Sequence, residues 1–155
     1  MPSDATAFTL SEIVWRLGVA TLCGMVLGLE REWRGKDAGL RTHALVALSS
    51  ALITASALSL YAMVRRQGGD ADPLRVIQGL AQAIGFIAAG TIFVARRSVK
   101  NLTTAASVWF SASAGIVAGA AQFTLLAVAM GFGLTILVVL KLLDRFGLAR
   151  SEEGE

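Results

Sequence analysis

The chain has 155 residues, of which 55% are hydrophobic, and its mean hydropathy is +0.65. This excludes an ordinary soluble domain, which is less apolar and has a mean hydropathy well below zero. The net charge of +3 does not indicate nucleic-acid binding, because basic residues in short loops set membrane topology and contact lipid headgroups. Composition therefore predicts an integral membrane protein whose surroundings are the lipid bilayer, with no nucleic-acid partner.

Five apolar segments follow one another, each about as long as a helix that crosses a bilayer. Unpaired backbone groups are costly in hydrocarbon, so all five are predicted to be helices. Their expected ranges are 9–29, 43–64, 74–95, 102–120 and 123–143. The predicted fold is an all-α, five-helix transmembrane bundle over residues 1–148, followed by a polar cytoplasmic tail at 149–155.

Basic residues are unevenly distributed between the loops. Ten of the 14 lie in the first loop, the third loop and the C-terminal segment, whereas the second loop holds three and the N-terminus and fourth loop hold none. The positive-inside rule then predicts an outside N-terminus and a cytoplasmic C-terminus. It also places the first and third loops on the same cytoplasmic face.

Small residues recur at helical spacing in three of the segments. The three sets are Ala20, Gly24 and Gly28; Ala81, Gly85 and Ala89; and Ser111, Gly115 and Gly119. Such stripes let helix backbones approach closely in lipid, either inside one bundle or at a dimer face. A shift of 62 residues also aligns Gly28 with Gly90 and Thr42 with Thr104, which is consistent with two repeated helical hairpins plus a fifth helix, or with small-residue bias alone.

The first loop and its flanks, residues 28–48, hold most of the polar chemistry. Glu30 is expected to pair with Arg34 one turn later, whereas Glu30 and Glu32 point to nearly opposite sides of a continuous helix. Gly35 and Gly39 allow a turn. Two interpretations remain: Glu30, Glu32 and Asp37 hold a hard cation such as magnesium, or the charges form a compensated salt-bridge network.

The second helix is expected to begin with Thr42 as its cap. Arg41 and His43 would flank that helix end and make it attractive to anions.

Other polar residues fall within the apolar segments. Arg16 lies one turn after Glu12 and either serves a function or ties helices together through backbone carbonyls. Gln78 and Gln82, together with a polar face on the fourth segment, either line a polar path or form inter-helix hydrogen bonds. With one histidine and one cysteine the sequence supports no zinc site or catalytic triad. Neither an enzyme nor a cofactor is expected.

Several blocks together resemble the MgtC/SapB family of bacterial inner-membrane proteins. They are Arg16, GLEREWRGKDAGLRTHALVAL from Gly28, IGFIAAGTIF from Ile84 and LTTAASVWFSASAGIVAGA from Leu102. The family pattern has glycine before LTTAA, where this chain has Asn101, a residue that also tolerates the left-handed conformation. The chain is similar to the short, membrane-domain-only branch, because little sequence follows the fifth segment.

The resemblance implies a multi-pass plasma-membrane protein of a family linked to virulence and to adaptation to low magnesium, acid or stress. It implies regulation of membrane complexes such as ATP synthase. Because a five-helix protein this small has little interior of its own, we expect it to act through contacts with a second copy, as a homodimer, or with such a membrane partner. The expected functional cluster is Arg16, Glu30, Arg31, Glu32, Gly39, Arg41, Thr42, His43, Leu102, Thr103 and Thr104. The alternative is a small magnesium or proton transporter with Arg16 and Glu30 in its path.

Overall fold

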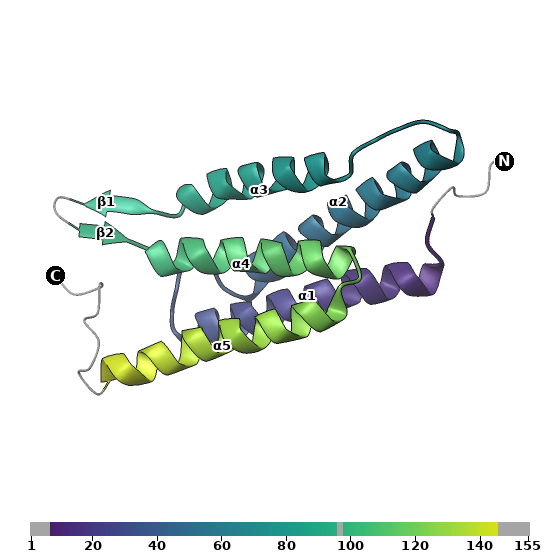
Figure 1. Cartoon of the computed structure of the whole chain (residues 1–155). Coiled ribbons are helices and arrows are strands. Elements are labelled where there is room, and N and C mark those ends of the chain that lie inside the picture. The colour runs from purple at the N-terminus through teal and green to yellow at the C-terminus, as the bar shows by residue number, and fades with distance from the viewer. Residues whose placement is uncertain (1–6, 96–97, 146–155) are drawn as a thin grey trace.

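The computed structural model describes residues 7–95 and 98–145, and nearly all of them are helical (Figure 1). The helices are α1 (Leu10–Trp33), α2 (Leu40–Arg66), α3 (Leu74–Ala89), α4 (Leu102–Gly119) and α5 (Phe123–Arg145). Two short strands, β1 (Phe93–Ala95) and β2 (Ser98–Lys100), lie between α3 and α4. The predicted all-α fold is confirmed, and the predicted tail at 149–155 lies outside the described residues.

Three helices, α1, α2 and α4, are long and apolar enough to cross a membrane. The helix α3 and the segment Phe123–Val139 of α5 are shorter apolar helices. In Figure 1, α4 lies between α3 on one side and α5 on the other, and α1 and α2 pack beside it. The most buried of the candidate spans is α4, as its central position requires.

Close packing at small residues holds α1, α2 and α4 together. A Cβ atom added at Gly24 would lie 2.5 Å from the His43 carbonyl oxygen, and one added at Gly119 would lie 2.6 Å from the Ala51 carbonyl oxygen. The small-residue stripes of α1 and α4 therefore face α2 and serve packing inside the bundle. This confirms the bundle interpretation for these two stripes.

The third predicted helix ends earlier than expected. We predicted a helix to residue 95, but α3 ends at Ala89 and the chain turns into the hairpin β1–β2, in which Phe93 pairs with Lys100 and Ala95 with Ser98. The prediction was wrong because two strands satisfy each other's backbone groups, which the argument against isolated strands overlooked. The segment Thr91–Val94 is rich in β-branched and aromatic residues, which favour strands.

Two left-handed backbone positions shape the ends of helices. Gly35 has φ +64° in the turn after α1, and Asn101 has φ 68° directly before α4. The left-handed turn predicted at Asn101 is therefore present with asparagine in place of glycine. Hairpins α1–α2 and α3–α4 differ in length, with helices of 24 and 27 residues against 16 and 18, and their internal repeat stays a prediction.

Candidate functional site

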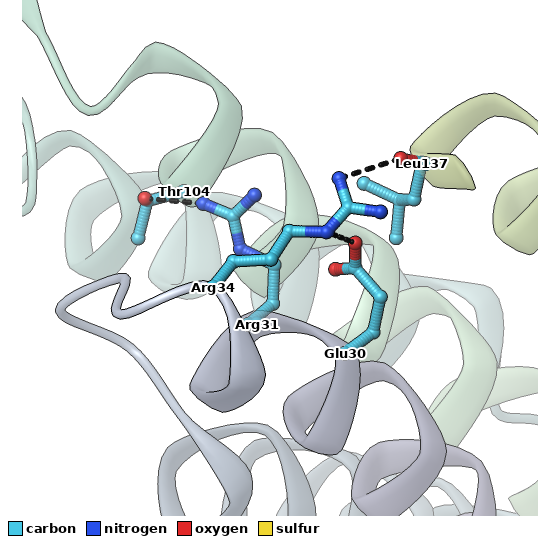
Figure 2. Close-up of polar contacts among 5 residues, drawn as sticks. All are labelled: Glu30, Arg31, Arg34, Thr104 and Leu137. Carbon is cyan, nitrogen blue, oxygen red and sulfur yellow. Dashed lines mark hydrogen bonds and ion pairs between the residues drawn. The ribbon is translucent and has the colours of Figure 1, made fainter. Parts of the chain in front are cut away.

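The predicted cluster gathers at one end of the bundle, where α1 ends and α2 and α4 begin. We call this the loop end. Arg31, in the last turn of α1, is 2% exposed, and its Nη2 donates to Thr104 Oγ1 at 2.6 Å (Figure 2). Thr104, in the first turn of α4, is 1% exposed. A buried guanidinium that donates to a buried hydroxyl joins α1 to α4 by a charge-assisted hydrogen bond.

A second link leaves the same end of α1 in another direction. Arg34 forms an ion pair through Nε with Glu30 Oε1, as the sequence predicted, and donates from Nη1 to the Leu137 carbonyl oxygen at 2.8 Å (Figure 2). Leu137 belongs to α5, which places this contact far from Arg34 in sequence. Glu30 therefore holds the arginine that anchors α5, and both side chains are largely buried.

His43, in the first turn of α2, is fully buried where α2 packs against α1 and α4. Its Nδ1 lies 2.9 Å from the Gly39 carbonyl oxygen and its Nε2 lies 3.1 Å from Ser107 Oγ. A carbonyl only accepts, so Nδ1 carries a hydrogen and donates to Gly39, whereas the single hydrogen of the Ser107 hydroxyl donates to the Thr104 carbonyl oxygen at 2.8 Å. Ser111 Oγ donates to the His43 carbonyl oxygen at 2.8 Å, so backbone and ring are both tied to α4.

Glu32 caps the start of α2 from the end of α1. Its Oε2 accepts from the Leu40 backbone N–H at 2.9 Å, while Gly39 takes the N-cap position with no side-chain cap of its own. We predicted Thr42 as the cap, which was wrong because α2 begins at Leu40, three residues before the predicted start at residue 43. Thr42 is exposed instead, and a carboxylate at this helix end also complements the helix dipole.

An open hollow lies at the loop end, with a volume of about 490 Å³. Its wall includes polar side chains from the first loop, from the segment after α3 and from the start of α4. The lining residues are Asp37, Ala38, Thr42, Gly90, Thr91, Asn101 and Thr104. Asn101 Nδ2 donates to Asp37 Oδ2 at 2.7 Å, so one wall is held across 64 residues of sequence.

Exposure divides the predicted cluster into a base and a rim. Arg31, His43 and Thr104 form the buried base. The rim consists of four exposed residues at the starts of α2 and α4, of which Thr42 also lines the hollow: Arg41, Thr42, Leu102 and Thr103. Gly39 and Glu32 belong to the helix cap between them, and the largely buried Glu30 pairs with Arg34 beside them. The structure therefore brings ten of the eleven predicted residues to the loop end.

Arg16 is the exception, because it lies near the opposite end of α1. Its Nη1 donates to the Gly119 carbonyl oxygen at 2.6 Å, and its guanidinium carbon lies 3.9 Å from the centre of the Phe8 ring. Gly119 is the last residue of α4, so Arg16 satisfies a helix C-terminal carbonyl and complements the helix dipole. Glu12, one turn before Arg16, accepts instead from Thr9 in a capping box.

The proposed cation cage does not form among these residues. Glu30 pairs with Arg34, Glu32 accepts from the Leu40 N–H, and Asp37 accepts from Asn101. The three carboxylates thus serve three different contacts, and of these only the Glu30–Arg34 pair belongs to the predicted salt-bridge network. Within residues 7–95 and 98–145, no three side chains of the metal-binding types come together.

The predicted polar path does not form either. Ser107 and Ser111 are buried and bonded to His43 and its carbonyl, whereas Gln78 and Gln82 lie exposed on α3. The sequence reasoning missed the contact of Arg34 with Leu137 and the Asp37–Asn101 pair. No local pattern signals contacts between residues so far apart in sequence.

Comparison with known proteins identifies the family to which this chain belongs. The profile of the MgtC family matches residues 17–146, which is most of the chain and includes the whole loop end. The chain belongs to the MgtC family. No solved structure gives a significant match to it.

Three curated relatives in the MgtC family show the range of names. The chain is 36% identical over 116 residues to the "Putative magnesium transporter YhiD" of Escherichia coli K12, 39% over 113 to "Protein SapB" of Bacillus subtilis 168, and 37% over 127 to "Protein MgtC" of Brucella abortus 2308. The matches cover 74%, 70% and 81% of this chain but 54%, 48% and 50% of the relatives. The chain therefore spans about half the length of the curated relatives it matches.

Proposed function

We propose that the chain is a non-enzymatic regulatory protein of the bacterial plasma membrane that acts in magnesium, acid or stress adaptation through contacts at its loop end. It crosses the membrane five times, with the N-terminus outside and the loop end in the cytoplasm. The family membership and the magnesium-related name of the Escherichia coli relative support the setting. Ten basic residues in the segments assigned to the cytoplasm support the orientation.

The observation that carries the regulatory role is the exposed rim at the starts of α2 and α4, set on a buried and bonded base. Arg31, His43 and Thr104 hold the first turns of α2 and α4 in place. Arg41, Thr42 and Thr103 remain exposed on those turns. A preorganised surface of this kind loses little conformational entropy when a partner binds. A membrane complex such as ATP synthase is the partner that we propose to test.

The separation of the charged groups argues against a single ion path. Arg16 and Glu30 are 14 residues apart on α1, which corresponds to about 21 Å along the helix. Arg16 bonds to α4 and Glu30 bonds to Arg34, so the two do not face one cavity. Transport of magnesium or protons remains the second candidate, because the Escherichia coli relative is named a putative magnesium transporter.

A reconstitution experiment separates the two functions. Purified protein in phospholipid vesicles would be tested for magnesium and proton flux, together with Glu30→Gln and Arg16→Ala. We expect no flux above that of empty vesicles from folded wild-type protein. Flux that both substitutions remove would overturn the regulatory proposal in favour of transport.

Capture from native membranes tests the rim directly. ATP synthase subunits should copurify with the wild-type chain after mild solubilisation and should be lost from Arg41→Glu or Thr103→Glu. Exposed Arg65, at the end of α2 far from the rim, supplies the control Arg65→Glu. Equal recovery with all three variants would exclude the rim as the binding surface.

A further inference from the structure

The helix α3 has one face packed in the bundle and another left open. Leu80, Ile84 and Ala88 are buried, and Leu80 and Ile84 pack with Ala112 of α4. The opposite side carries exposed residues at helical spacing, which we call the outer face of α3: Gln78, Gly79, Gln82, Ala83 and Phe86. In Figure 1, none of the helices in the described residues lies beyond α3 on the side away from α4.

The depth of the outer face follows from the packing of the inner face. Ala112 lies near the middle of α4, which is long and apolar enough to cross a membrane. Leu80 and Ile84 contact it, so Gln82, which lies between them in sequence, sits at the level of the middle of α4. If α4 crosses the bilayer, the Gln82 amide lies deep in the hydrocarbon.

The side-chain amides of Gln78 and Gln82 are unfavourable in contact with lipid tails, because the tails offer no hydrogen-bond partner. No hydrogen bond joins the Gln78 or Gln82 side chain to any other residue in the part of the chain that the structure describes. An amide without a partner in an apolar medium costs several kcal/mol. Polar side chains in membrane helices usually bond across to another helix. The two amides lie one turn apart on the same face, so one additional helix would serve both.

We infer that the outer face of α3 binds the α3 helix of a second copy of this chain. Two copies inserted in the same orientation are related by a twofold axis along the membrane normal, which places equivalent residues at equal depth. A primary amide both donates and accepts, so Gln82 can bond to the same residue of the second copy, and so can Gln78. The inference rests on the proposed topology, in which α3 crosses the membrane.

Small residues beside the amides permit the close approach that this pairing needs. A Cβ atom added at Gly79 would have no atom within 4 Å, so the position is open. Gly79 and Ala83 form a small-xxx-small pair directly next to Gln78 and Gln82. The stripe that we predicted on α3 lies beside this face: a Cβ atom at Gly85 would contact Trp109 at 3.5 Å, whereas Ala89 is exposed. Phe86, 83% exposed, extends the same contact surface.

Cysteine crosslinking in vesicles tests this interface. The parent chain carries Cys23→Ala, which removes the only cysteine, and receives either Gly79→Cys or Gly131→Cys. Gly131 of α5 is the matched control, because a Cβ atom there also meets nothing within 4 Å. We expect oxidation to yield a disulfide-linked dimer from Gly79→Cys at least tenfold more than from Gly131→Cys. Equal yields from both would indicate random collision and overturn the interface.

A substitution of the amide then tests its part in pairing. Adding Gln82→Leu to Gly79→Cys should weaken dimerisation roughly tenfold, or about 1.4 kcal/mol, measured as crosslinking against protein-to-lipid ratio. Thr135→Val is the control, since the exposed Thr135 hydroxyl already donates to the Gly131 carbonyl of its own helix. An unchanged dimer with Gln82→Leu, at wild-type helical content, would refute the proposal.

Labelling separates this result from a failure of the topology. A membrane-impermeant maleimide should react slowly with Gly79→Cys in vesicles and rapidly after detergent is added. Rapid labelling without detergent would place α3 in water and remove the basis of the inference, while leaving the regulatory proposal to its own test. Crosslinks in native membranes only to a different protein would show that the outer face binds another partner.

Discussion

Arg31 and Arg34 lie one turn apart at the end of α1, yet their guanidinium groups point in opposite directions, to α4 and to α5 (Figure 2). Three residues advance a helix by about 300°, which leaves the two Cβ atoms on neighbouring faces. The divergence therefore comes from the long side chains and from the partners that each one reaches. One turn of α1 fixes two other helices, and this explains why so many charges occupy so short a segment.

The first prediction concerns the buried link to α4. Thr104→Val keeps the shape of the side chain but removes the acceptor of Arg31 Nη2, so a charged donor loses a buried hydrogen bond. We expect the free energy of unfolding to fall by about 1–3 kcal/mol. Thermal unfolding in detergent, followed by circular dichroism, measures the change. Neighbouring Thr103 is exposed, so Thr103→Val should lower the free energy of unfolding far less than Thr104→Val does. Equal decreases from the two substitutions would contradict the assigned contact.

The second prediction concerns the link to α5. Arg34 uses Nε for Glu30 and Nη1 for the Leu137 carbonyl, and lysine has a single nitrogen that cannot reach both. Arg34→Lys should therefore lower the free energy of unfolding by about 1–2 kcal/mol and loosen α5. Hydrogen exchange over α5 reports the loosening. Arg41→Lys, at an exposed position, should leave exchange unchanged, and the prediction is wrong if both substitutions behave alike.

Much of the fold follows from hydropathy, because each apolar segment has few ways to satisfy its backbone in lipid. The starts of the third, fourth and fifth predicted segments match α3, α4 and α5 to the residue. The errors fall where charge or turn chemistry governs the chain. Glu30 and Arg31 read as loop residues but extend α1 to Trp33, and the segment after Ala89 leaves the helix for a hairpin.

In the candidate site, too, some contacts could be predicted from the sequence and others could not. Local pairs such as Glu30 and Arg34 follow from helical spacing and were predicted. Contacts such as Arg31 with Thr104 depend on which helices become neighbours, and a single sequence contains no signal for that choice. The resemblance to a family marked both blocks as important. Only the structure shows that one supplies the donor and the other the acceptor.

The third prediction distinguishes the two caps considered for α2. Glu32→Ala removes the carboxylate that accepts from the Leu40 N–H and should lower the free energy of unfolding by about 1 kcal/mol. Glu32→Gln keeps an acceptor oxygen and should retain most of that stability. Thr42→Val should have little effect, because exposed Thr42 lies beyond the N-cap. Chemical unfolding of the three variants measures these changes. A larger fall in the free energy of unfolding from Thr42→Val than from Glu32→Ala would show that threonine is the cap.

The fourth prediction tests the close contact between α1 and α2 at Gly24. A Cβ atom at Gly24 would lie 2.5 Å from the His43 carbonyl oxygen and 2.8 Å from Ala44 Cα, and both are backbone atoms that cannot move aside. Gly24→Ala should therefore push α1 from α2 and lower the free energy of unfolding by about 1–3 kcal/mol.

Gly18 supplies the control for this fourth prediction, because a Cβ atom there meets nothing within 4 Å. Gly18→Ala should be neutral or slightly stabilising, since alanine favours helix more than glycine does. The displacement at Gly24 should also disturb His43, whose carbonyl accepts from Ser111. The His43 ring resonances in an NMR spectrum should therefore shift in Gly24→Ala and stay in place in Gly18→Ala. Unchanged stability together with unchanged resonances in Gly24→Ala would show that α1 and α2 are further apart than the structure places them.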